Sequence, residues 1–261
     1  MSNYKKSLAT LELPAVLQML SAEAVSETAK ELALELSPSD NEYEVKRRLD
    51  ETSAAKSMMT VRGGPGFSGV KDVRASLARA DLGGALNTRE LMDIARVLQC
   101  ARLVRGYIAD DSVGKTSIDS LFFALRANKY LEEKINTSIV GEDEIADGAS
   151  HELASIRRQM RAAAARAREA LTKIISSPGY AKALQEPIIT MRSDRYVVPV
   201  KADHKGAIPG LVHDISTSGM TLFVEPMAAV KANNELRELN AKEKIEIERI
   251  LAELSADCAE Y

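Results

Sequence analysis

Basic side chains gather in two neighbouring parts of this sequence, and the chemistry that such clusters suit is contact with phosphate. The first cluster lies in a segment of helical periodicity whose only acid between residues 157 and 173 is Glu169, and the second lies in a β-rich segment that follows it. Lysine and arginine contacts to phosphate give affinity and position the protein, but they read little sequence. We predict that nine residues bind nucleic acid: Arg157, Arg158, Arg161, Arg166, Arg168, Arg192, Arg195, Lys201 and Lys205. The competing interpretation is a solvated, charged helix face.

No arrangement of residues predicts catalysis or a metal site. In the β-rich segment, His213 would point to the opposite side of a strand from Asp214 and Ser216, so these residues cannot form a local triad. The Gly-Lys-Thr-Ser segment at 114–117 resembles the end of a phosphate-binding loop, but Ala109 stands where such a loop needs its first glycine. We therefore expect no catalytic residue, no metal ligand and no bound cofactor in this chain.

The composition argues against several classes of protein. A formal net charge of −3 gives no global basic field, and aromatic residues make up only 4% of the chain, too few for a base-stacking platform. Two cysteines far apart indicate neither a disulfide framework nor a metal site. No apolar run has the length of a membrane span or the character of a signal sequence. We expect a soluble, cytoplasmic protein with no membrane contact.

The first basic cluster is predicted to lie on a long helix over residues 143–176. Apolar or small residues recur there every three or four positions, as they do along one side of a helix. They are Leu153, Ile156, Met160, Ala163, Ala167, Leu171 and Ile174. A less regular stripe on a returning helix consists of Leu236, Leu239, Ile247, Ile250, Leu254, Cys258 and Tyr261. Two such stripes joined by a compact connector can be buried against each other, which predicts an antiparallel coiled coil.

Between the two helices, residues of about 186–226 are predicted to form four short antiparallel strands. β-branched runs flank the turn pair Ser193-Asp194, and a second pair of runs flanks a turn in which Gly219 can take a positive φ. Pro199 has no backbone N–H, which places its strand at a sheet edge or at a bulge. The second basic cluster would therefore lie on a small β tip.

The predicted fold class is mainly α. Residues 1–140 show helical periodicity and are expected to form a helical core. Residues 141–261 are expected to form a long antiparallel coiled-coil arm, tipped by a small four-stranded antiparallel β-sheet.

Segments of the arm resemble the second bacterial branch of the MutS family. They are Arg-Tyr-Val-Val-Pro-Val-Lys at 195–201, the segment from Gly210 to Pro226, and Asn-Asn-Glu-Leu at 233–236. The segments at 8–13 and 82–91 also fit the N-terminal region of that branch, so the resemblance spans most of the chain.

The resemblance implies a core, or lever, that carries a clamp at its end. In this family an ATPase domain of the ABC type follows, usually with a nuclease domain, and the protein forms a homodimer through the ATPase. ATP and Mg²⁺ are therefore expected for a full-length parent with ATPase and endonuclease activity. This chain stops at Tyr261 within a periodic helix and lacks Walker and nuclease motifs. We expect it to be a non-catalytic segment, truncated before the ATPase domain.

The resemblance also implies a function, which is to bind branched or double-stranded DNA and suppress homologous recombination. One alternative is a ribosome-associated ATPase that splits collided ribosomes, in which the arm grips ribosomal RNA. A second alternative is a coiled-coil module for protein–protein contact. Arg192→Glu with Lys201→Glu should abolish nucleic-acid binding under the first two functions and leave it unchanged under the third.

Overall fold

The computed structural model describes residues 3–67, 69–108 and 115–261. Ala109 and Gly114, which bear on the segment at 114–117, lie outside these residues. The protein is mainly helical with a small four-stranded antiparallel sheet, which confirms the predicted fold class. It divides into two compact units, one formed by Met1–Ala146 with Leu251–Tyr261 and the other by Asp147–Ile250. The division into a core at 1–140 and an arm at 141–261 stays a prediction.

The first unit consists of helices and one small β ladder. The helices are α1 (Asn3–Thr10), α2 (Leu13–Glu23), α3 (Glu27–Leu34), α4 (Glu42–Arg62), α5 (Arg74–Asp81), α6 (Thr88–Tyr107), α7 (Asp119–Ala124) and α8 (Lys129–Ser138). Asn87 and Glu90 form a capping box that starts α6, the helix that buries Leu91. Strands β1 (Ile139–Gly141) and β2 (Glu144–Ile145) pair antiparallel after α8.

The second unit contains two long helices and the four-stranded sheet. Its elements are η1 (Asp147–Ala149), α9 (His151–Ile175), β3 (Thr190–Arg192), β4 (Arg195–Lys201), η2 (Ala202–His204), β5 (Gly210–Ile215), β6 (Thr221–Pro226) and α10 (Met227–Glu260). Helix α10 continues into the first unit, where Lys134 on α8 forms ion pairs with Glu253 and Asp257 at 2.8 and 2.7 Å.

Helix α9 is shorter than the predicted helix over residues 143–176, and the reason lies at its start. Residues between Ile139 and Ile145 pair as β1 and β2 instead of joining the helix. Ser150 then caps α9, because its Oγ accepts a hydrogen bond from the N–H of Leu153 at 2.9 Å. The helix ends at Ile175, ahead of Pro178, as the sequence predicts.

The sheet has the strand order β3-β4-β6-β5, and every neighbouring pair is antiparallel. Ser193 and Asp194 have φ of 48° and 59°, so the predicted two-residue turn joins β3 to β4. The edge position predicted from Pro199 is wrong, because β4 lies between β3 and β6. Proline is tolerated there because β3 pairs only with the first half of β4, from Arg195 to Val197. Beyond that point Gln185 donates its N–H to the carbonyl of Pro199.

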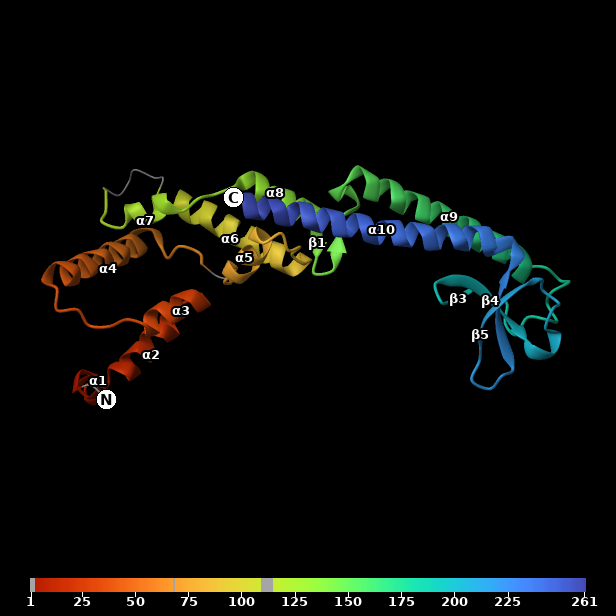
Figure 1. Ribbon diagram of the computed structural model, residues 1–261, viewed down its shortest axis with the longest axis horizontal. Helices are drawn as coiled ribbons and strands as arrows, with labels where there is room; N and C mark the ends of the chain where they lie inside the picture. The colour runs from red at the N-terminus through yellow and green to blue at the C-terminus, as the bar shows by residue number, and fades with distance from the viewer. Residues whose placement is uncertain (1–2, 68, 109–114) are drawn as a thin grey trace. The chain divides into compact units, whose positions relative to one another are not determined.

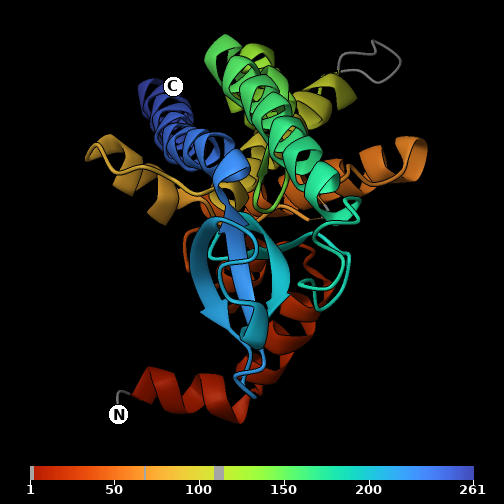
Figure 2. The same ribbon diagram turned by 90° about the vertical axis from the view of Figure 1, so that its right-hand side faces the viewer.

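One hydrophobic core joins α9, α10 and the sheet. It contains Ala163 and Leu171 from α9, Val198 and Leu222 from the sheet, and Leu236 from α10, among others. Figure 1 shows α9 and α10 side by side with the sheet near the start of α10, and Figure 2 shows the same three parts from the end. All seven stripe residues predicted on α9 are buried or half-buried. Of the stripe predicted on the returning helix, Tyr261 lies one residue beyond the end of α10 and is 47% exposed.

Among the described helices, none is long and apolar enough to cross a membrane. Within the same described ranges, no group of three or more His, Cys, Asp or Glu residues is placed to hold a metal ion.

Candidate nucleic-acid interface

Three of the predicted arginines on α9 bind carboxylates of the second unit. Arg157 pairs with Asp147 at 2.7 Å and with Glu243 on α10 at 2.6 Å, and only 20% of its side chain is exposed. Arg161 also pairs with Asp147, at 3.1 Å. Arg166 pairs with Glu235 on α10 at 2.6 Å. The pairs from Arg157 and Arg166 link the two helices in antiparallel register.

The other two predicted residues of α9 have different surroundings. Arg158 is exposed, and no carboxylate of the described chain forms an ion pair with it. The guanidinium of Arg168 lies over the ring of Tyr196 on β4, with its central carbon 5.2 Å from the ring centroid. Of the five predicted residues on α9, Arg158 is therefore the one most open to a phosphate.

The two arginines of the tip are also bound to protein groups. Arg192 lies over the ring of Phe223, 4.1 Å from its centroid, and its Nε is 3.3 Å from Asp214. Arg195 binds both oxygens of Glu225 through Nη1, at 2.7 and 2.9 Å, and its Nη2 donates to Asn234 at 2.9 Å. With only 14% of its side chain exposed, Arg195 joins the sheet to α10.

A buried polar cluster surrounds Glu225, whose side chain is fully buried. Besides Arg195, its carboxylate contacts His213 on β5 and accepts a hydrogen bond from Asn233 at 2.7 Å. Asn233 also bonds the backbone N–H and carbonyl of Tyr196, at 3.1 and 3.0 Å. A buried carboxylate is stable only when such partners satisfy it. The cluster therefore fixes β4, β5 and β6 to the first turns of α10.

Sequence reasoning missed this cluster and interpreted His213 as part of a plain hairpin strand. One signal was present, since Glu225 is a charged residue that directly follows the apolar run Leu222-Phe223-Val224. A charge at the end of a buried strand needs a partner. Its partners lie 8 to 30 residues away along the chain, so the sequence could not identify them.

Glu225 and Glu246 are among the carboxylates of the second unit whose pKa values are lowered. Burial alone would raise the pKa of Glu225, but hydrogen bonds from Asn233, His213 and Arg195 outweigh burial and lower it. Hydrogen bonds from Arg249 and Ser150 lower the pKa of Glu246 to about 2. A carboxylate whose pKa is lowered by folding stabilises the folded state above its unfolded pKa. That contribution is lost as the pH falls through the folded pKa.

We therefore expect the second unit to lose stability as the pH falls from about 5 towards 2. The change is measured by hydrogen exchange of the α9 and β6 amides in increasing urea, repeated at several pH values across that range. Glu246→Gln should make the dependence shallower, because it removes one of the titrating groups. If the free energy of unfolding stayed constant across this pH range, Glu225 and Glu246 would not stabilise the folded state through lowered pKa values.

The two predicted lysines of the tip form no ion pair with a described carboxylate; Lys201 is half-buried and Lys205 is exposed. Lys201 ends β4, and Lys205 follows η2. Their backbone is fixed, since the N–H of Lys201 bonds Ala183 at 2.9 Å and that of Lys205 bonds Ala202 at 3.3 Å. The structure thus separates the nine predicted residues into internally paired arginines and open positions at Arg158, Lys201 and Lys205. Whether any of the nine binds nucleic acid stays a prediction.

These features define a mainly helical protein in which two long helices carry a small antiparallel sheet. The chain is 48% identical over 257 residues to the endonuclease MutS2 of Ruminiclostridium cellulolyticum, a match covering 98% of this chain and 32% of that protein. It is 45% identical over 257 residues to the endonuclease MutS2 of Acetivibrio thermocellus, covering 97% of this chain and 32% of that protein. The endonuclease MutS2 of Pelotomaculum thermopropionicum is also 45% identical over 257 residues, a match covering 98% of this chain and 33% of that protein.

The predicted resemblance to the second bacterial branch of the MutS proteins is confirmed by these relatives. This chain spans about a third of the length of the curated relatives it matches. No protein-family model matches it.

Proposed function

We propose that this chain is the lever-and-clamp segment of a MutS2-type protein and that its sheet-bearing tip contacts the phosphates of branched DNA. The observation that carries the proposal is the position of Lys201 and Lys205. Both lie on fixed backbone at the end of the sheet, and neither forms an ion pair among the described residues. Cations without an internal ion pair can bind a polyanion without first giving up a carboxylate partner.

The internal ion pairs support a mechanical role for α9 and α10. Arg157 and Arg166 bridge the two helices, and the cluster around Glu225 attaches the sheet to α10. A rigid support of this kind would transmit a movement of the helices to the tip. In the parent protein we propose that ATP and Mg²⁺ bind outside this segment, that a homodimer brings two tips around one DNA, and that suppression of recombination follows. The endonuclease activity named for the relatives would also belong to the parent.

A competition assay tests the proposed DNA binding. A fluorescent four-way DNA junction bound to this chain is challenged with unlabelled junction and, separately, with purified bacterial ribosomes. Displacement by junction at lower concentration than by ribosomes is the expected result. If ribosomes compete far better, the tip binds ribosomal RNA instead. If the chain binds neither, the second alternative of a protein–protein module replaces the proposal.

A further inference from the structure

The turn between β5 and β6, residues 216–220, is held rigidly by its own hydrogen bonds. Ser216 donates its N–H to the carbonyl of Thr221 at 2.9 Å, and its hydroxyl accepts from the N–H of Thr221 at 3.0 Å. Gly219 donates to the carbonyl of Ser216 at 2.8 Å and has a φ of 71°, which a side chain would strain. The turn therefore presents its side chains on a fixed backbone.

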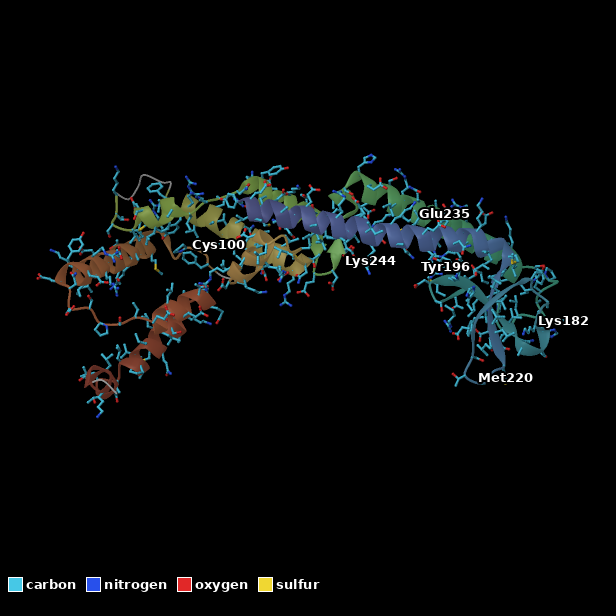
Figure 3. All side chains as sticks on the ribbon, in the orientation of Figure 1. Cys100, Lys182, Tyr196, Met220, Glu235 and Lys244 are labelled. Atoms are coloured by element: carbon cyan, nitrogen blue, oxygen red, sulfur yellow. The ribbon has the colours of Figure 1, made fainter. Side chains whose placement is uncertain are left out.

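This rigid turn carries apolar side chains into solvent. Met220 is 70% exposed, and Ile215, at the other side of the same turn, is 55% exposed. Figure 3 places Met220 at the end of the hairpin that points away from α9 and α10. A single exposed apolar residue is ordinary on a protein surface. Two at the end of a fixed, projecting turn form an apolar tip.

The backbone of both open lysines lies next to this turn. Lys201 pairs with Thr221, the residue after Met220, across β4 and β6. The carbonyl of Met220 accepts a hydrogen bond from Ala202 at 3.0 Å, and Ala202 in turn bonds Lys205. An exposed apolar side chain with cations close by on the same stretch of backbone matches the chemistry of a nucleic-acid strand, in which apolar base faces lie between phosphates. Proteins that kink DNA insert such a side chain between bases while cations hold the backbone.

We propose that Met220 is a wedge that enters an interrupted base stack, so that the tip prefers DNA at a branch point to continuous duplex. The inference rests on the proposed function and adds the feature that the tip would recognise. Unstacking a continuous duplex costs free energy that a branch point has already lost in part. Lys201 and Lys205 supply affinity for any DNA, and Met220 supplies the preference for interrupted stacking.

The test compares the 261-residue chain with its Met220→Ala variant on two labelled DNAs, a four-way junction and a continuous duplex of the same length. The junction carries 2-aminopurine at its branch, a base whose fluorescence rises when it is unstacked. We expect wild-type protein to raise this fluorescence and the variant to raise it less. The ratio of junction affinity to duplex affinity should fall about tenfold in the variant, with duplex affinity unchanged. Met227→Ala removes another exposed methionine, at the start of α10, and should change neither quantity.

The two DNAs separate this inference from the proposed function. Equal affinity ratios and equal fluorescence for wild type and Met220→Ala would overturn the wedge while duplex binding still supported the proposed function. Absence of binding to both DNAs would overturn both. If Met220→Ala lowered the ratio of junction affinity to duplex affinity by the same factor with an RNA four-way junction, the wedge would be supported and its ligand would extend to RNA with interrupted stacking.

Discussion

Replacing Glu225 with alanine is expected to lower the free energy of unfolding of the second unit by about 3–5 kcal/mol. The substitution leaves Arg195 and the fully buried amide of Asn233 without their carboxylate partner. Removing one member of a buried, hydrogen-bonded charge cluster costs far more than removing a surface ion pair, because the remaining groups stay desolvated. Hydrogen exchange of the β4 and β6 amides in increasing urea measures the free energy of unfolding at the sheet.

Glu235→Ala is the matched control for this expectation. Glu235 also pairs with an arginine of the second unit, but the side chains of Arg166 and Glu235 are 53% and 39% exposed. Its loss should cost less than about 1 kcal/mol. Equal destabilisation by the two variants would mean that the cluster around Glu225 does not hold the sheet to α10.

Reversing the charge of both open lysines, Lys201→Glu with Lys205→Glu, is expected to weaken DNA binding about a hundredfold, or roughly 2.8 kcal/mol. Each lysine would lose its attraction to phosphate, and each new carboxylate would repel it. The loss should be similar for junction and duplex, because phosphate contacts carry little information about sequence or stacking. Fluorescence anisotropy at low salt measures both affinities.

Lys244→Glu provides the control for charge reversal. Lys244 is exposed on α10, away from the sheet (Figure 3), and has no ion pair among the described residues. We expect it to change affinity less than about twofold, through the change in net charge alone. If Lys244→Glu weakened binding as much as the double variant, the tip would not be the contact surface.

The fold of the second unit could be predicted well where local rules decide it. The stripe from Leu153 to Ile174 identified the buried side of α9, since helical spacing alone brings those residues together. The turn at Ser193-Asp194 was predictable because serine and aspartate are frequent turn residues. Such features need no knowledge of distant partners.

The errors arose where distant segments decide the structure. The predicted helix over residues 143–176 starts too early, because pairing between Ile139 and Ile145 removes that segment from α9. Pro199 suggested an edge strand, yet β4 lies between β3 and β6, and β3 is so short that Pro199 has a strand partner only on the β6 side. Both outcomes depend on how long a neighbouring element is, which local sequence does not reveal.

The sequence predicted one basic surface of nine residues, and the structure shows that protein groups occupy most of the arginines in it. All nine basic residues looked alike in the sequence, but Arg157 meets Glu243 from 86 residues away and Arg195 meets Glu225 from 30 residues away. These pairings leave Lys201 and Lys205 as the open cations of the tip. Phosphate contact by the tip is therefore proposed for fewer residues than the sequence alone suggested.

The most direct test of the account is the salt dependence of binding between this chain and a labelled four-way DNA junction, followed by fluorescence anisotropy. We predict binding at low salt whose affinity falls steeply as salt rises, since each phosphate contact adds about 0.9 to the slope of log affinity against log salt. The Lys201→Glu, Lys205→Glu variant should have a slope shallower by about 2. No binding at low salt, or a slope that both proteins share, would contradict the proposal that this tip grips DNA phosphates.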